Sequence, residues 1–324
     1  MSATPIEIVF KKAGGLDLYI DVYLSPKATP ENPSPILIWW HAGGMLMGTR
    51  KHVAPHHQRA TAEYNVTFVS AEYRLSPQFR MPTVLTDCVD AVNFLSSEEF
   101  KKATGGRTDP SRIILNGSSV GGWISQIVGN SIGFKEAGIA PVIHKDSIKG
   151  IVSVYPMTNL EDEFFKKQYK PLGIIGAAVG LPEDRIIADE EVARFIDPEN
   201  PDSRTANAPF DGPRTLLYFY AVQEGIVEKL LLGGTGLSGS VFSVPQHFRN
   251  LSSAEGVPPI YLIHGDSDGS VPVTSSQHVA AAVRALGHKD FTYVELKGVD
   301  HLYDQEPEES MEGMYVFIKR ILKL

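Results

Sequence analysis

The sequence predicts an α/β fold in which helices cover both faces of a mostly parallel central sheet. Continuous apolar runs at residues 35–40 and 150–155 have the length and composition of strands that are buried on both faces. Amphipathic stretches of helical period, such as residues 84–95, lie between such runs. Because parallel strands are joined by crossover connections, the alternation of strands and helices favours a parallel sheet.

Outside the middle of the chain these elements follow one another in a regular order. Residues 6–10 and 16–24 alternate apolar and polar side chains around Gly14-Gly15, which is typical of an antiparallel hairpin. This hairpin should form an edge of the sheet. The other expected strands are 35–40, 65–73, 113–115, 150–155, 260–264 and 291–296, and the expected helices are 84–95, 122–128, 275–286 and 312–324.

The alternation breaks down in the middle of the chain, where prolines, charged helical pieces and glycines are mixed. We therefore expect one α/β domain, residues 1–324, with a cap inserted at about 158–256. The aromatic residues of this insertion either line a substrate pocket or form the core of the cap; they are Phe164, Phe165, Tyr218, Phe219 and Tyr220.

A G-x-G-x-x-G pattern runs from Gly234 to Gly239, but the residues before it look helical. A dinucleotide site needs a strand before the glycines and a helix after them, so we interpret this segment as a loop of the cap and expect no cofactor.

Composition excludes several classes of function. The net charge is −8 and no basic stripe is present, which argues against a nucleic-acid partner. No apolar run is long enough to cross a bilayer, and residues 1–5 do not resemble a leader peptide, so we expect a cytoplasmic protein. The single cysteine, Cys88, lies in an amphipathic stretch and should be buried. His52, His56 and His57 lack an H-E-x-x-H pattern and a nearby carboxylate, so no metal site is expected.

The pentapeptide Gly117-Ser118-Ser119-Val120-Gly121 has the form G-x-S-x-G. It lies between a short apolar strand and a helical stretch, which is the setting of a nucleophile elbow. Glycines two positions before and after the serine are needed because side chains there would collide with neighbouring backbone. Ser119 is therefore the candidate nucleophile.

A serine hydroxyl needs a base to remove its proton and an acid to orient that base. His301 directly follows the expected strand 291–296 and is the candidate base. The acid should follow the strand 260–264, where Asp266 and Asp268 compete. We prefer Asp268, because the loop has the form H-G-x-x-D-x-x-V-P, and expect Asp266 to bond nearby backbone amides. The order Ser119, Asp268, His301 is that of the α/β-hydrolase fold.

Backbone amides should stabilise the oxyanion that forms when the serine attacks. The N–H of Val120 opens the helix after the elbow, where the helix dipole favours negative charge. Gly43 and Gly44, in the loop after strand 35–40, let the backbone approach a substrate closely. His41 should brace this loop. Val120, Gly43 and Gly44 are the candidate oxyanion hole.

The runs at 41–44, 71–77 and 117–122 together resemble the hormone-sensitive-lipase-like branch of the α/β-hydrolases. That branch typically shows H-G-G-G, then D-Y-R-L-A-P-E, then G-D-S-A-G-G. This chain departs from it by having Ala42 for the first glycine, Glu72 and Ser118 for aspartates, and Gln78 for the glutamate. These changes indicate a divergent member whose substrate need not be a simple lipid ester.

The resemblance implies hydrolysis of a carboxylic ester without a cofactor, under a cap that sets the preference for acyl and alcohol groups. Two alternatives remain open at this point. An acyl-enzyme could pass its acyl group to an alcohol or amine or close a lactone, and the fold could serve as a non-catalytic ligand receptor. The expected partner is a small ester or acyl substrate, and a homodimer through helix 312–324 or an edge strand is also left open.

Overall fold

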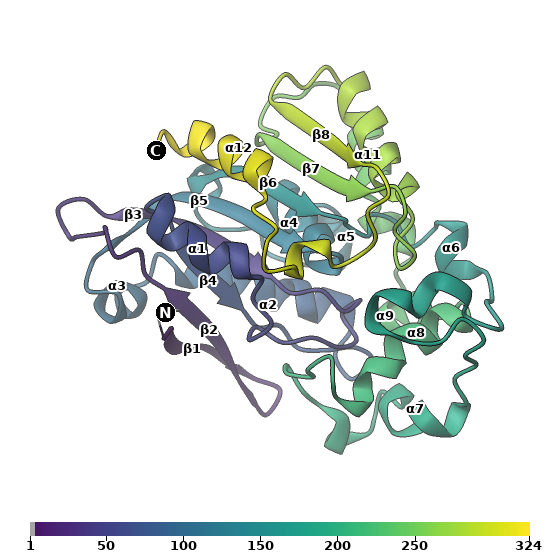
Figure 1. Cartoon of the computed structure of the whole chain (residues 1–324). Helices are drawn as coiled ribbons and strands as arrows, with labels where there is room; N and C mark the ends of the chain where they lie inside the picture. The colour runs from purple at the N-terminus through teal and green to yellow at the C-terminus, as the bar shows by residue number, and fades with distance from the viewer. Residues whose placement is uncertain (1–3) are drawn as a thin grey trace.

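The centre of the molecule is an eight-stranded sheet, shown in Figure 1. The computed structural model describes residues 4–324. The strands are β1 (Ile6–Ala13), β2 (Leu16–Tyr23), β3 (Ser34–Trp40), β4 (Thr67–Ala71), β5 (Thr108–Ser118), β6 (Ile148–Val154), β7 (Ile260–Gly265) and β8 (Phe291–Leu296). Their spatial order is β1-β2-β4-β3-β5-β6-β7-β8. The β1–β2 and β2–β4 pairs are antiparallel and all the others are parallel, which confirms the expected hairpin edge on a mostly parallel sheet.

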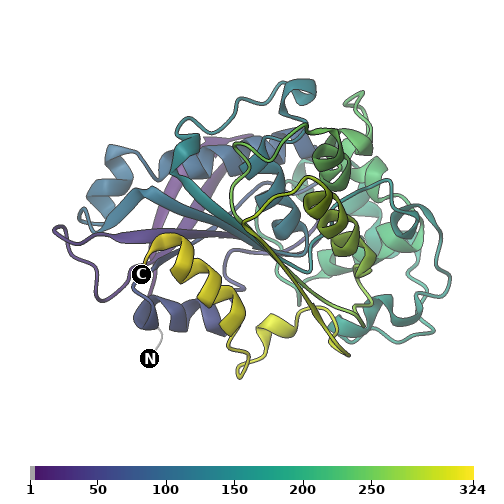
Figure 2. The same ribbon diagram turned by 90° about the horizontal axis from the view of Figure 1, so that it is seen from above.

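Helices cover both faces of this sheet. They are α1 (Pro55–Glu63), α2 (Met81–Phe94), α3 (Glu98–Ala103), α4 (Val120–Asn130), α5 (Phe134–Ala137), α6 (Glu163–Lys166), α7 (Asp189–Ile196), α8 (Leu216–Gln223), α9 (Val227–Leu232), α10 (Val244–Asn250), α11 (Thr274–Ala285) and α12 (Glu312–Leu322). Figure 2 shows α1 and α12 on one face and α2, α4 and α11 on the other. Alternate residues of β3 enter the two cores, since Ile38 packs with α2 and α4 while Leu37 packs with α12. This two-sided burial explains the unbroken apolar run of β3.

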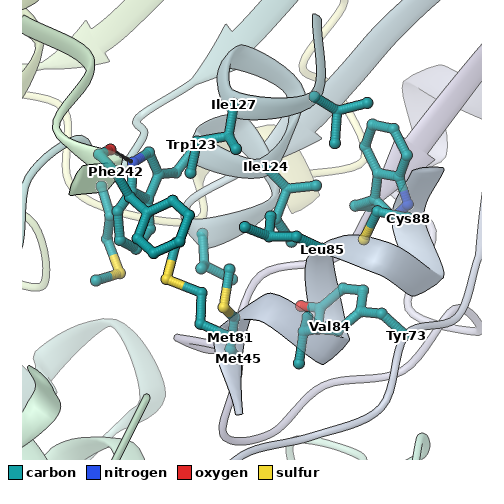
Figure 3. Close-up of a cluster of buried hydrophobic side chains, with 14 of the residues drawn as sticks. Met45, Tyr73, Met81, Val84, Leu85, Cys88, Trp123, Ile124, Ile127 and Phe242 are labelled. Atoms are coloured by element: carbon teal, nitrogen blue, oxygen red, sulfur yellow. Dashed lines mark hydrogen bonds between the residues drawn. The ribbon is translucent and has the colours of Figure 1, made fainter. Parts of the chain in front are cut away.

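The larger core includes α2 and α4, and part of it is shown in Figure 3. Cys88 is fully buried there, as predicted, and burial raises the pKa of its thiol well above the usual value. Trp123 of α4 donates its indole N–H to the carbonyl of Phe242 at 3.0 Å. This bond ties the helix that follows Ser119 to the chain between β6 and β7.

The boundaries and some short helices differ from expectation. Helix α2 begins at Met81, because Pro82 fits the first turn of a helix, where its fixed backbone angle is favourable. Helix α1 was not predicted, since it buries His56 and His57 in place of an apolar stripe. The expected strand 113–115 is the end of the longer β5.

Residues 155–259, which we call the β6–β7 segment, hold α6 to α10 and no strand of the sheet. In Figure 1 the helices α6 to α9 lie together beside the sheet. The glycine-rich run 233–239 follows helix α9, so its surroundings differ from those of a dinucleotide site. The residues before this run look helical in the sequence, and Gly225, with φ of 66°, separates α8 from α9 there.

The expectation for residues 1–5 falls partly on residues 1–3, which lie outside the described residues. Across residues 4–324, none of the helices combines the length and the apolar character that crossing a bilayer requires.

Candidate active site

Ser119 occupies a strained turn between β5 and α4. Its φ of 57° and ψ of −121° are unusual for a residue with a side chain. A Cβ atom at Gly117 would overlap the backbone of Gly121, and a Cβ at Gly121 would overlap the carbonyl of Trp40. The predicted need for glycine on both sides of the serine is therefore confirmed. Ser119 is the N-cap of α4 but makes no side-chain capping bond, so its hydroxyl is not used to hold the helix.

His301 and Asp268 meet at the carboxyl ends of β7 and β8. Nδ1 of His301 lies 2.6 Å from Oδ2 of Asp268. Since a carboxylate only accepts, Nδ1 carries the proton and Nε2 is the ring nitrogen available to take another. Asp266, the alternative acid, instead accepts the N–H of Gly298 at 2.6 Å and lies on the exposed side of the loop.

A second histidine, His264, supports Asp268 from within β7. Its Nε2 is 3.0 Å from the carbonyl of Val271 and 3.2 Å from the Asp268 carboxylate. Because both neighbours are acceptors, Nε2 carries the proton, and Nδ1 accepts from the Ser276 hydroxyl at 2.7 Å. Burial alone would raise the pKa of Asp268, but His301 and His264 hold that pKa well below its usual range. The carboxylate is therefore charged at neutral pH.

Gly43 and Gly44 follow β3 in a loop that only glycine can form. Their φ values are 111° and 64°. A Cβ at Gly43 would overlap the carbonyl of Met47, and one at Gly44 would overlap the ring of Tyr218. His41, whose Nδ1 lies 2.7 Å from the carbonyl of Ala42, supports the start of this loop. Burial lowers the pKa of His41 to about 4, so it is neutral at pH 7.

One narrow cavity, with a volume of about 20 Å³, is lined by Ser119, His301, Gly43 and Gly44 together. Its remaining walls are mostly apolar, and the β6–β7 segment supplies several of them, namely Val179, Phe210, Tyr218 and Phe219. Five aromatic residues of the insertion were expected to line a pocket or to form the core of the cap. Of these, only Tyr218 and Phe219 line this cavity, and Phe165, for example, is buried in the larger core. A larger hollow of about 600 Å³ lies at the end of α4 and beside α10, and its lining is largely polar and does not include Ser119.

A buried carboxylate below the elbow was not found from the sequence. Asp304, three positions after His301, is fully buried and accepts hydrogen bonds from the hydroxyls of Ser118, at 3.0 Å, and of Tyr155. The ring of Tyr155 lies 4.4 Å from that of His301, centre to centre. Burial would raise the pKa of Asp304, but the nearby His56, whose Nε2 lies 4.0 Å from the carboxylate, and the hydrogen bonds from Tyr155 and Ser118 hold that pKa low. Ser118, at the position where the related motif carries an aspartate, thus bonds a carboxylate from the loop that carries His301.

The histidine cluster of α1 is engaged in other contacts. Nδ1 of His56 lies 2.8 Å from the hydroxyl of Tyr315, and Nε2 of His57 lies 2.9 Å from the Asn116 amide. Residues 4–324 contain no group of three or more histidine, cysteine or acidic side chains arranged to hold a metal ion.

A family model described as the alpha/beta hydrolase fold matches residues 37–186. An alpha/beta hydrolase superfamily protein from Enterococcus faecalis has a TM-score of 0.66 at 17% identity, over 95% of this chain and 96% of that chain. Esterase 2 of Thermogutta terrifontis, phosphonylated by sarin, has a TM-score of 0.62 at 17% identity, over 99% and 96% of the two chains. At such low identity these structures establish the shared fold alone.

Curated relatives by sequence are much longer proteins. Non-reducing polyketide synthase ascC of Acremonium egyptiacum is 25% identical over 321 residues, which is 92% of this chain and 14% of the synthase. Non-reducing polyketide synthase Preu6 of Preussia isomera is 22% identical over 330 residues, which is 94% of this chain and 14% of that synthase. This chain therefore spans only a small part of the length of these relatives.

Proposed function

We propose that this chain, which has the α/β-hydrolase fold, is a carboxylesterase-like enzyme that cleaves a carboxylic ester through an acyl-enzyme on Ser119. The observation that carries the proposal is the single cavity that presents Ser119, His301 and the Gly43-Gly44 backbone together. Asp268 stands behind His301 at 2.6 Å, so the chain supplies a nucleophile, a base and the group that orients the base.

In the acylation step Oγ of Ser119 attacks the ester carbonyl while Nε2 of His301 takes the hydroxyl proton. The charged Asp268 carboxylate stabilises the resulting imidazolium of His301 and itself stays deprotonated. The tetrahedral intermediate collapses when His301 passes the proton to the departing alcohol oxygen. Water, deprotonated by His301, then attacks the acyl-enzyme and releases the acid and the free serine.

The oxyanion of the tetrahedral intermediate would be held by the N–H groups of Gly43, Gly44 and Val120. Val120 is the first residue of α4, so its N–H has no partner within the helix and the helix dipole favours an anion there. Preorganised donors of this kind are each worth about 10²–10³ in rate.

We propose that residues 158–256, which belong to the β6–β7 segment, act as the cap of a single α/β-hydrolase domain. Val179, Phe210 and Phe219 come from this region and wall the cavity, so they would select the acyl or alcohol group. These apolar walls would also limit the entry of water to the acyl-enzyme.

Acyl transfer is the second candidate, because the synthases that match this chain are by name makers of polyketides. An acyl-enzyme shielded from water could pass its acyl group to an alcohol, or to a hydroxyl of the same acyl chain, which closes a lactone. Reaction of an aryl ester in the presence of competing alcohols decides between the two, because hydrolysis yields only free acid, whereas transfer yields a new ester.

The direct kinetic test uses short p-nitrophenyl esters. We expect Ser119→Ala to lose at least about 10⁴-fold in kcat while it keeps its fold, because the nucleophile is absent. Ser118→Ala, which leaves the hydroxyl of Ser119 in place, is the matched control and should retain most of the activity. If Ser119→Ala turned over the ester at the wild-type rate, the proposal would be refuted.

A further inference from the structure

Arg214 is a buried arginine with no acidic partner. Its side chain is about 4% exposed and lies in the β6–β7 segment, in the short 3₁₀ turn Pro213–Thr215. Burial is the cause that lowers the pKa of its guanidinium to about 10, and it therefore stays charged at neutral pH. Throughout residues 4–324 no carboxylate lies within ion-pair distance of it. A buried charge without a counter-ion is costly unless its hydrogen bonds are all well made.

The guanidinium donates to neutral oxygens on three different loops. Nε donates to the carbonyl of Leu46 at 2.6 Å, and Nη1 donates to the carbonyl of Ser203 at 3.0 Å. Nη2 donates to the carbonyl of Ser76 at 2.6 Å and to Oε1 of Gln78 at 2.8 Å. Gln78 is the position where the related motif carries a glutamate, which would pair with the cation. Here the donors of Arg214 are used to hold backbone carbonyls, and this indicates a geometric role.

The loop that Arg214 holds is the one that carries Gly43 and Gly44. The Leu46 N–H bonds back to the carbonyl of Gly43 at 3.0 Å, so Gly43 and Leu46 form one tight turn. The ring of Tyr218, from α8, lies directly against Gly44. Gly48 and Ala208 exchange backbone hydrogen bonds at 2.7 and 2.8 Å. The β6–β7 segment thus touches both ends of the loop, and Arg214 fixes the carbonyl between them.

We propose that Arg214 is a positioning residue for the oxyanion hole: by bonding the Leu46 carbonyl it holds the N–H groups of Gly43 and Gly44 where the oxyanion forms. This inference rests on the proposed esterase function. The N–H groups of Gly43 and Gly44 stabilise the oxyanion, which forms only after the serine attacks. Loss of Arg214 should therefore raise the energy of the transition state and leave substrate binding nearly unchanged.

The test compares Arg214→Met and Arg214→Lys with Arg204→Met, an exposed arginine of the same segment. Rates are normalised to the sites labelled by a fluorophosphonate, so that any misfolded fraction is excluded. For both Arg214 variants we expect kcat on a short p-nitrophenyl ester to fall by about 10- to 100-fold, with KM within about twofold. A lysine keeps the charge but cannot direct its donors to all three loops at once, so it should not restore the rate. Arg204→Met should behave as the wild type.

A reversible trifluoromethyl ketone, which forms an oxyanion on the serine, supplies the second readout. Its affinity should fall by the same factor as kcat in the Arg214 variants, whereas the affinity for the product carboxylic acid should stay constant. Unchanged kcat, or a loss confined to KM with full affinity for the ketone, would overturn the inference. If Arg214→Met does not fold, Arg214→Lys decides by the same measurements. Absence of fluorophosphonate labelling in the wild type would instead refute the proposed function.

Discussion

The sheet with its attached loops and the β6–β7 segment line the same cavity, but they bring different things to it. Ser119, Asp268 and His301 lie just after the carboxyl ends of three strands of the sheet, namely β5, β7 and β8. The segment brings the apolar walls Val179 and Phe210. This difference indicates that changes in the sheet region should remove the reaction, whereas changes in the segment should alter its rate or its substrate.

The largest effect in the sheet region, after the serine itself, is expected at Asp268. We expect Asp268→Asn to lower kcat by about 10³–10⁴-fold, because the asparagine no longer stabilises the His301 imidazolium. Asp266→Asn is the matched control on the same loop and should lower kcat by less than about tenfold, since Asp266 bonds only backbone and a hydroxyl. Equal losses in the two variants would remove the distinction between these aspartates.

The next effect lies where the two regions touch. We expect Gly44→Ala to lower kcat by about 10²–10³-fold, because the added Cβ overlaps the Tyr218 ring and displaces the oxyanion loop. Gly15→Ala has a similar positive φ, 80°, but nothing lies within 4 Å of the added atom, so it controls for backbone strain alone. Steady-state kinetics on the same ester checks both variants, and a normal kcat in Gly44→Ala would separate the loop from catalysis.

A change confined to the segment should alter preference and leave the chemistry intact. Val179→Ala enlarges the cavity, so we expect the ratio of kcat/KM for longer over shorter acyl chains to rise by about tenfold. Ile174→Ala is the matched control. Ile174 lies in the same 3₁₀ helix, Gly173–Val179, but it is exposed and does not line the cavity. A panel of p-nitrophenyl esters measures both, and an unchanged ratio in Val179→Ala would show that this wall does not select the acyl group.

The smallest effect concerns the stability of the sheet region. The pKa of Asp304 is lowered in the folded chain, so its charged form stabilises the fold above the pKa of an unfolded aspartate, about 4, and this stabilisation is lost as the pH falls below it. We expect Asp304→Asn to reduce the free energy of unfolding at pH 7 by on the order of 1 kcal/mol. The difference in free energy of unfolding between the wild type and Asp304→Asn should become smaller as the pH falls below about 4. Urea unfolding at several pH values measures this difference. A difference that does not change with pH would contradict the prediction.

Sequence reasoning reached further in the sheet region than in the segment, for a physical reason. Strands buried on both faces have continuous apolar runs, and the turn at Ser119 requires glycines, which can be read directly from the sequence. His264 and Asp304 carry no such signal, because their roles come from residues brought together by folding. Arg214 was missed for the same reason, since its partners are carbonyl oxygens, which every residue has.

In the proposed mechanism Ser119 is the residue that reacts covalently with the substrate. The most direct measurement is intact-protein and peptide mass spectrometry after incubation with a fluorophosphonate, on the wild type and on Ser119→Ala. We expect one adduct per chain, on the peptide that contains Ser119, and none in the variant. An unlabelled wild type, or equal labelling of the Ser119→Ala chain, would contradict the account.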